Sequence, residues 1–173
     1  CECHTPVEPT SWTTEDGTTY APLDNEHDSM AAMLASLDET QLATAQLSST
    51  FTDVLVGPQQ DGQFPATKEG LAVSELSDEQ KALVLAAMQP WVQNADEVTA
   101  TELLAIYEEE LDETYIAFSG DPSLTNNADY ARIDGPSVWI ELASQSSDID
   151  PSGIHYHTIW RDRVLDYSAE FSS

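Results

Sequence analysis

Two histidines separated by one residue form the clearest candidate site in the sequence. His155 and His157 lie in a β-branched and aromatic run that predicts a strand, and residues two apart on a strand project from the same face. Two neutral imidazoles on one face are a donor set for zinc or copper. Glu141, in another predicted strand, could add a carboxylate ligand. The alternative is a polar sheet face on which both histidines hydrogen-bond to nearby carboxylates.

The N-terminal residues form a second dense set of donors. Cys1, Cys3 and His4 supply two thiols and an imidazole within four residues, a combination that suits copper or zinc. We predict that they bind a cofactor, either alone or together with the strand histidines. Haem is a weaker alternative, because Cys1 lies one residue too close to Cys3–His4 for the C-x-x-C-H spacing. Lipidation of Cys1 is a further interpretation, as is a disulfide to another chain.

The segment DIDPSG (148–153) resembles the first half of a calcium-binding loop, with Asp148 and Asp150 as its first ligands. Position twelve of such a loop would be Ile159, where a bidentate Glu is required. An EF-hand is therefore excluded, and a looser calcium site is predicted. The alternative is a tight turn before the last strand.

Enzymatic motifs are absent from the sequence. It has no G-x-S-x-G, H-E-x-x-H, Walker or G-x-G-x-x-G pattern. Either strand histidine could pair with a carboxylate such as Asp162 for acid–base chemistry. Because these motifs are absent, the sequence favours a protein that is not an enzyme. Arg161 and Arg163 flank Asp162 and predict an ion-pair cluster on an acidic surface.

Charge dominates the composition. Asp and Glu number 32 against five Lys and Arg, which gives a formal net charge of -27. Nucleic acid binding needs a basic face, so the composition argues against it, and no apolar stretch is long enough to span a membrane. Self-repulsion of this size needs salt or bound cations. We therefore predict an extracytoplasmic protein, secreted, periplasmic or on the cell surface, in saline or calcium-bearing surroundings, with either a solvated acidic coat or specific cation sites.

The length of 173 residues is that of one domain. Residues 1–22 are predicted to be an extended segment with a short hairpin turning at Asp16–Gly17, and residues 23–173 a single domain. Helical periodicity begins near residue 30, and Pro90 predicts a kink or an end in the third helix. Three helices are predicted to begin with capping pairs, which are Ser36 with Glu39, Ser77 with Gln80, and Asn94 with Glu97.

The last third changes to strand-like runs, at 115–118, 130–133, 138–142 and 154–160. Gly, Pro, Asp and Asn separate these runs, which favours an antiparallel sheet. Because the helices precede the strands, the predicted class is α+β, with N-terminal helices packed on a C-terminal antiparallel sheet.

Four segments carry a resemblance to a known family: DGTTYAPL (16–23), MLASL (33–37), DYARIDGPSVWIE (129–141) and IHYHTIWRD (154–162). They closely resemble the C-terminal half of a bacterial family named domain of unknown function 3500. The resemblance implies a secreted protein of no established activity. Family members are longer, and their upstream half carries a His-His segment that this chain lacks.

These observations predict a secreted or cell-surface acidic domain that binds a metal ion through its His-x-His strand. A second interpretation is a structural subunit of an extracellular assembly, in which the Cys-containing N-terminus links copies of the chain. A third interpretation is a metal-dependent enzyme.

Overall fold

The structure is a computed structural model that describes residues 2–60, 62–147, 149 and 153–164, with only the backbone of residues 2–4. The helices are α1 (Asp24–Ala35), α2 (Glu39–Ala45), α3 (Asp78–Val92) and α4 (Glu97–Glu109), with single 3₁₀ turns at Val73–Glu75 and Leu111–Glu113. The strands are β1 (Glu2–Val7), β2 (Trp12–Thr13), β3 (Thr19–Tyr20), β4 (Leu71–Ala72), β5 (Tyr115–Ser119), β6 (Tyr130–Asp134), β7 (Val138–Ser146) and β8 (Ile154–Asp162).

One antiparallel sheet organises the described part of the chain. Its six strands run in the order β1-β8-β7-β6-β5-β4, and β2 and β3 form a separate hairpin. The predicted α+β class is confirmed, and the four predicted strands correspond to β5, β6, β7 and β8. The sequence did not indicate β4, which is only two residues long, or β1, which contains a proline and polar residues that are uncommon in strands.

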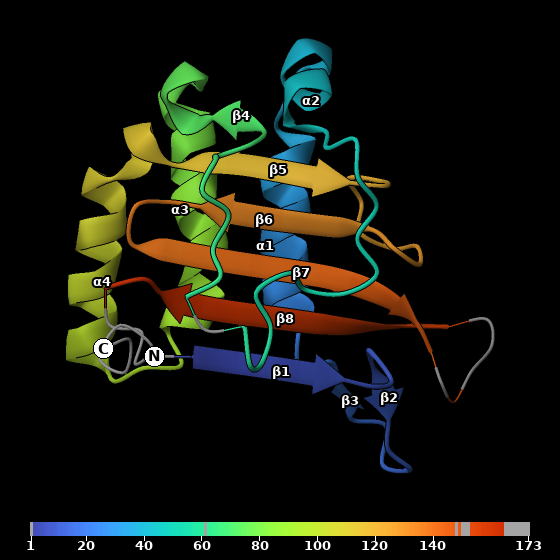
Figure 1. Cartoon of the computed structure of the whole chain (residues 1–173). Coiled ribbons are helices and arrows are strands. Elements are labelled where there is room, and N and C mark those ends of the chain that lie inside the picture. Colours follow the sequence, from blue (N-terminus) through green and yellow to red (C-terminus); the bar gives the residue numbers. More distant parts are fainter. Residues whose placement is uncertain (1, 61, 148, 150–152, 165–173) are drawn as a thin grey trace.

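The helices cover one face of this sheet, and α1 and α3 lie behind the strands in Figure 1. Side chains from alternate strand positions point into this helix-covered face, since neighbouring residues on a strand project to opposite sides. Its apolar side chains are buried, including Phe118, Ile133, Ile140, Leu142 and Trp160. Burial of this apolar surface is the main stabilising contribution to the fold.

The helix starts show where local sequence signals succeed and fail. Ser77 caps α3 in a capping box with Gln80, as predicted. The predictions for α2 and α4 are wrong by two residues, because Asp38 and Asp96 are the N-caps. Ser36 cannot cap α2 because its backbone is helical at the end of α1, whereas an N-cap is extended. Pro90 lies inside α3, which runs two residues further before it ends.

The N-terminal segment is extended, and its hairpin turns as predicted at Asp16–Gly17 between β2 and β3. The preceding strand β1 does not stand apart from the rest of the chain. It pairs with β8 along its whole length, from Glu2 opposite Arg161 to Val7 opposite Tyr156. The N-terminal residues are therefore at the edge of the main sheet, beside the strand that carries the two histidines.

The face of the sheet that points away from the helices lies under a long irregular stretch, named here the covering segment (residues 47–70, of which 61 is not described). This segment connects α2 to β4 and crosses the strands on the near side in Figure 1. It ends at Gly70, whose φ of +99° and close approach to the Ile116 carbonyl oxygen exclude a larger residue. The side chains of this face include three of the predicted site residues, Glu141, His155 and His157.

Candidate functional site

The two strand histidines face each other. Their Nε2 atoms are 3.2 Å apart, and their ring centroids are 4.9 Å apart with a tilt of 56°. His155 is 6% exposed and the side chain of His157 is 20% exposed. The pair therefore lies at the margin of the segment-covered face, partly open to solvent, with both rings on one side of β8 as the alternation predicts.

The outer nitrogen atoms of the two rings face carboxylates. The Nδ1 atom of His157 lies 2.9 Å from Oδ1 of Asp53, and Nδ1 of His155 lies 3.9 Å from Oε1 of Glu8. Asp53 belongs to the covering segment, whereas Glu8 follows β1 and accepts a hydrogen bond from the hydroxyl of Ser147. Only the contact of His157 is a hydrogen bond; among the described residues, Nδ1 of His155 is buried and has no hydrogen-bond partner. A carboxylate that accepts from the outer nitrogen is an arrangement that metal-ligating histidines commonly show, and here His157 has it.

The separation of the two inner nitrogens suits two ligands of one ion. With zinc–nitrogen distances of about 2.0–2.1 Å, nitrogens 3.2 Å apart subtend an angle of about 100–105° at the metal. This angle is close to tetrahedral and far from the linear arrangement of a two-coordinate ion. The pair, His155 and His157, therefore offers two donors and leaves further coordination positions for water or other ligands.

Glu141 is engaged elsewhere on the same face. Its fully buried carboxylate accepts four hydrogen bonds. Two come from backbone N–H groups of the covering segment, at Leu55 (2.6 Å) and Val56 (2.9 Å), and two from the side chains of Tyr130 (2.6 Å) and Trp139 (2.7 Å). Four donors compensate for the desolvation of the buried charge. Glu141 thereby holds the covering segment against the sheet.

Arg161 holds the same stretch of the covering segment through its carbonyl groups. The guanidinium donates to the carbonyl oxygens of Val56 (2.9 Å) and Gly57 (2.8 Å). Arg161 is fully buried, so the surface position predicted for it is wrong. Asp162, the next residue, points to the helix-covered face and accepts a hydrogen bond from the Tyr107 hydroxyl, because adjacent strand residues project to opposite sides.

Comparison with known proteins identifies the family of the chain. The profile of the family described as "Protein of unknown function (DUF3500)" matches residues 3–169, nearly the whole sequence. The chain belongs to the DUF3500 family. No curated protein and no solved structure matches it. Family membership therefore supports the resemblance seen in the sequence but assigns no activity.

The site residues predicted for this DUF3500 chain fall into three groups. His155 and His157 lie together, and Glu141 shares their face but binds the covering segment. Within the described ranges, no group of three or more His, Cys, Asp or Glu side chains is placed to hold a metal ion. Cys3 and His4 are in β1, opposite Trp160 and Ile159 in the register. Cys1, Asp148 and Asp150 lie outside the described residues.

Sequence reasoning missed Asp53 and Glu8, which are far from the histidines in the chain and carry no motif. It also missed a concentration of cations. Four of the five Lys and Arg residues, all five of which are described, lie on the segment-covered face. Besides Arg161, Lys68 and Arg163 pair with the buried Asp134 at 2.9 and 2.5 Å, and Arg132 pairs with a glutamate of the covering segment. In a chain of net charge -27, these cations gather where carboxylates are buried.

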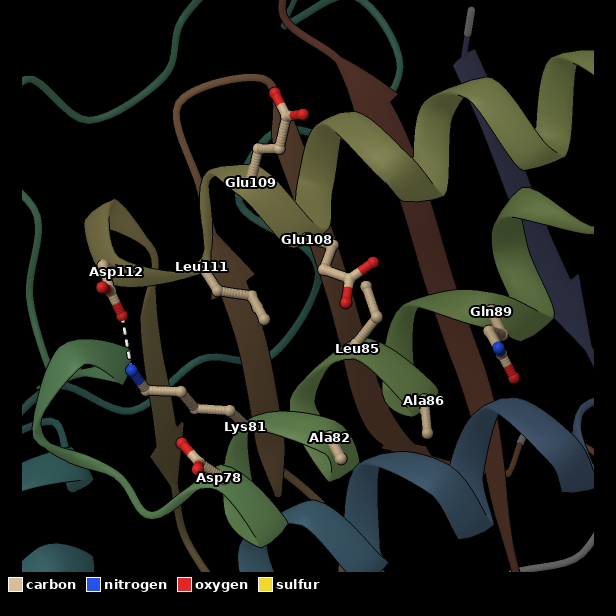
Figure 2. Close-up of a pocket in the computed structure, with 10 residues that line it drawn as sticks. All are labelled: Asp78, Lys81, Ala82, Leu85, Ala86, Gln89, Glu108, Glu109, Leu111 and Asp112. Atoms are coloured by element: carbon tan, nitrogen blue, oxygen red, sulfur yellow. Dashed lines mark hydrogen bonds and ion pairs between the residues drawn. The ribbon is translucent and has the colours of Figure 1, made fainter.

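A separate pocket of about 420 Å³ lies in the helix layer, between α3 and α4 (Figure 2). Its walls carry the carboxylates of Asp78, Glu108, Glu109 and Asp112, and Lys81 donates to Asp112 at 2.6 Å. The histidine pair lies on the opposite face of the sheet, so this acidic pocket is not part of the same site.

Among the residues that the structure describes, none of the helices is both long enough and apolar enough to cross a bilayer.

Proposed function

We propose that this chain binds a divalent transition-metal ion, zinc or copper, through the Nε2 atoms of His155 and His157. The observation that carries the proposal is the 3.2 Å separation of these atoms, combined with the carboxylate of Asp53, which lies 2.9 Å from the outer nitrogen of His157. Imidazole is a preferred ligand of both metals. The remaining coordination positions take water or a ligand from outside the two side chains.

Partial exposure supports binding of an ion from solution. His155 is almost buried, whereas Asp53 is 54% exposed at the outer edge of the pair. An ion can therefore reach the nitrogens without opening the core, while the neighbouring protein keeps both rings in place. Two protein ligands give weaker binding than the three or four of catalytic and structural zinc sites, so the ion is exchangeable.

The composition supports an extracytoplasmic setting for this binding. A net charge of -27 destabilises a compact chain at low ionic strength and is tolerated in saline or cation-rich surroundings. The finer proposals, that the family is bacterial and that this chain corresponds to its C-terminal half, depend on the four resembling sequence segments. An intact mass of the native protein tests processing, lipidation and haem attachment together.

The test of the metal proposal is a calorimetric titration of the metal-free protein with Zn²⁺ and with Cu²⁺. We expect one equivalent bound by imidazole above a weak background from the acidic surface. The double variant His155→Ala/His157→Ala should lose this equivalent, with at least a hundredfold fall in affinity, while its circular dichroism spectrum stays unchanged. The matched control is His27→Ala, which removes a histidine of α1 that contacts Asp28 and the Ser123 carbonyl.

Two further experiments distinguish binding by the histidine pair from binding by other donors. Calcium prefers oxygen ligands, so titration with Ca²⁺ measures the carboxylate background, which should be equal in all variants. A variant with Cys1→Ser, Cys3→Ser and His4→Ala tests the N-terminal donors. Equal Zn²⁺ binding by the wild type and the double histidine variant would contradict the proposal, whether the ion was then held by the N-terminus or by the acidic surface.

A further inference from the structure

We infer that Asp53 is the positioning residue of the histidine pair: its carboxylate holds His157 in the tautomer whose Nε2 lone pair points toward His155. The consequence for metal affinity depends on the proposed function. The tautomer itself is a property of the metal-free protein, so the two ideas can fail separately.

Two neighbours of His157 favour opposite tautomers. A carboxylate can only accept, so the 2.9 Å contact between Nδ1 and Asp53 requires a hydrogen on Nδ1. The side-chain nitrogen of Gln145 lies 3.2 Å from the same Nδ1 atom and can donate to it only when Nδ1 is unprotonated. The contact with Asp53 is shorter and charge-assisted, and such hydrogen bonds are about twice as strong as neutral ones. Asp53 therefore decides the tautomer.

The tautomer determines whether His157 can bind a metal. With the hydrogen on Nδ1, the Nε2 atom of His157 carries a lone pair that accepts the 3.2 Å hydrogen bond from Nε2–H of His155. With the hydrogen on Nε2, His157 becomes the donor of this contact and has no Nε2 lone pair for a metal. Removal of Asp53 leaves the amide of Gln145 as a donor to Nδ1, which favours the tautomer that cannot bind a metal.

The sheet fixes Asp53 in place through the backbone next to it. The Oδ1 atom of Asp53 accepts a hydrogen bond from the N–H of Val54 at 2.7 Å, which orients the carboxylate. The following peptide groups are held by Glu141 through N–H groups and by Arg161 through carbonyl oxygens. These buried contacts hold an irregular segment, without secondary structure of its own, at a fixed distance from His157.

The first test is nitrogen-15 NMR of the histidine rings in the metal-free protein, which distinguishes the two tautomers by their ring nitrogen shifts. The wild type should show the Nδ1–H tautomer at His157. In Asp53→Ala the Nε2–H tautomer should become the major form, whereas Gln145→Leu should retain the wild-type form. An Nε2–H tautomer in the wild type, or no change in Asp53→Ala, would overturn the inference.

The second test is Zn²⁺ affinity of the same variants. Loss of a carboxylate behind a ligating histidine typically weakens metal binding about 10- to 100-fold, which is the fall expected for Asp53→Ala. Gln145→Leu should stay within about threefold of the wild type, since the competing donor is removed. A changed tautomer with no histidine-dependent Zn²⁺ binding in any protein would reject the proposed function and keep the role of Asp53. Histidine-dependent binding that is equal in Asp53→Ala and the wild type would reject the role of Asp53 and keep the function.

Discussion

The helix-covered face and the segment-covered face of the sheet are both buried, but different interactions hold their coverings. Ile140 points toward the helices into a continuous apolar core, whereas its neighbour Glu141 points toward the covering segment and accepts four hydrogen bonds. The segment contributes to a small apolar cluster around Val56, Trp139 and Ile159, and its Phe51 stacks on the ring of Tyr130.

The difference follows from what each covering contributes. A helix satisfies its own backbone hydrogen bonds and presents apolar side chains, so contact with it needs only complementary shape. An irregular segment has backbone N–H and C=O groups that need partners when they are buried. Glu141 and Arg161 supply these partners. The same directional contacts fix individual side chains, which makes the segment-covered face the one suited to a binding site.

The largest expected effect comes from the helix-covered face. Ile140→Ala should lower the free energy of unfolding by about 3–4 kcal/mol, because it removes buried apolar surface and leaves a cavity. Urea denaturation followed by fluorescence measures this loss. The orientation of Asp53 against His157 should be unchanged, so the Zn²⁺ affinity of the folded variant should match that of the wild type. A loss below about 1 kcal/mol would show that this face does not form the main core.

A smaller but more local effect is expected on the other face. Glu141→Gln should lower the free energy of unfolding by about 2–3 kcal/mol, because an amide group cannot accept all four hydrogen bonds and turns a donor toward donors. Hydrogen exchange of the Leu55 and Val56 amides should accelerate far more than that of β5. Glu102→Gln, an exposed change on α4, removes the same charge and is the control. Uniform acceleration across the sheet would mean that the segment is not held locally.

The smallest expected effect is a pH-dependent gain in the free energy of unfolding when Glu26, a carboxyl buried on α1, is replaced by Gln. Burial raises the pKa of Glu26 above its ordinary value of 4.5. Ionisation of Glu26 therefore destabilises the folded protein. This destabilisation is absent below the ordinary pKa and grows as the pH rises through the raised pKa of the folded state. Glu26→Gln should therefore stabilise the protein at about pH 7 and leave it unchanged at about pH 3, relative to Glu102→Gln. Urea denaturation at the two pH values measures the difference, and a gain of equal size at both would contradict burial as the cause.

Local sequence signals predicted most of the fold. Strand periodicity and flanking turn residues located β5 to β8, and the Ser77–Gln80 pair marked the start of α3. The errors fall where a local signal depends on its neighbour. Ser36 belongs to a suitable capping pattern but is already part of the end of α1. Strand β1 was missed because its formation depends on pairing with β8, at the other end of the chain.

The site was predicted only in part. The common face of His155 and His157 follows from the two-residue period of a strand. Asp53 could not be identified, because an irregular segment has no period that relates its residues to the sheet. Glu141 was expected beside the histidines, and its register does place it on their face, opposite Ile159. Its partners in the covering segment could not be inferred from the strand sequence.

The amino-acid sequence by itself determined the acidic character, the α+β class and the pairing of two imidazoles on one strand, because composition and short periods are local properties of a chain. The tertiary structure decided which carboxylates stand behind those imidazoles and which are bound to backbone instead. The position of Asp53 depends on where the covering segment crosses the sheet. That path is set by the N–H groups of Leu55 and Val56, which donate to Glu141, and by the carbonyl groups of residues 56 and 57, which accept from Arg161.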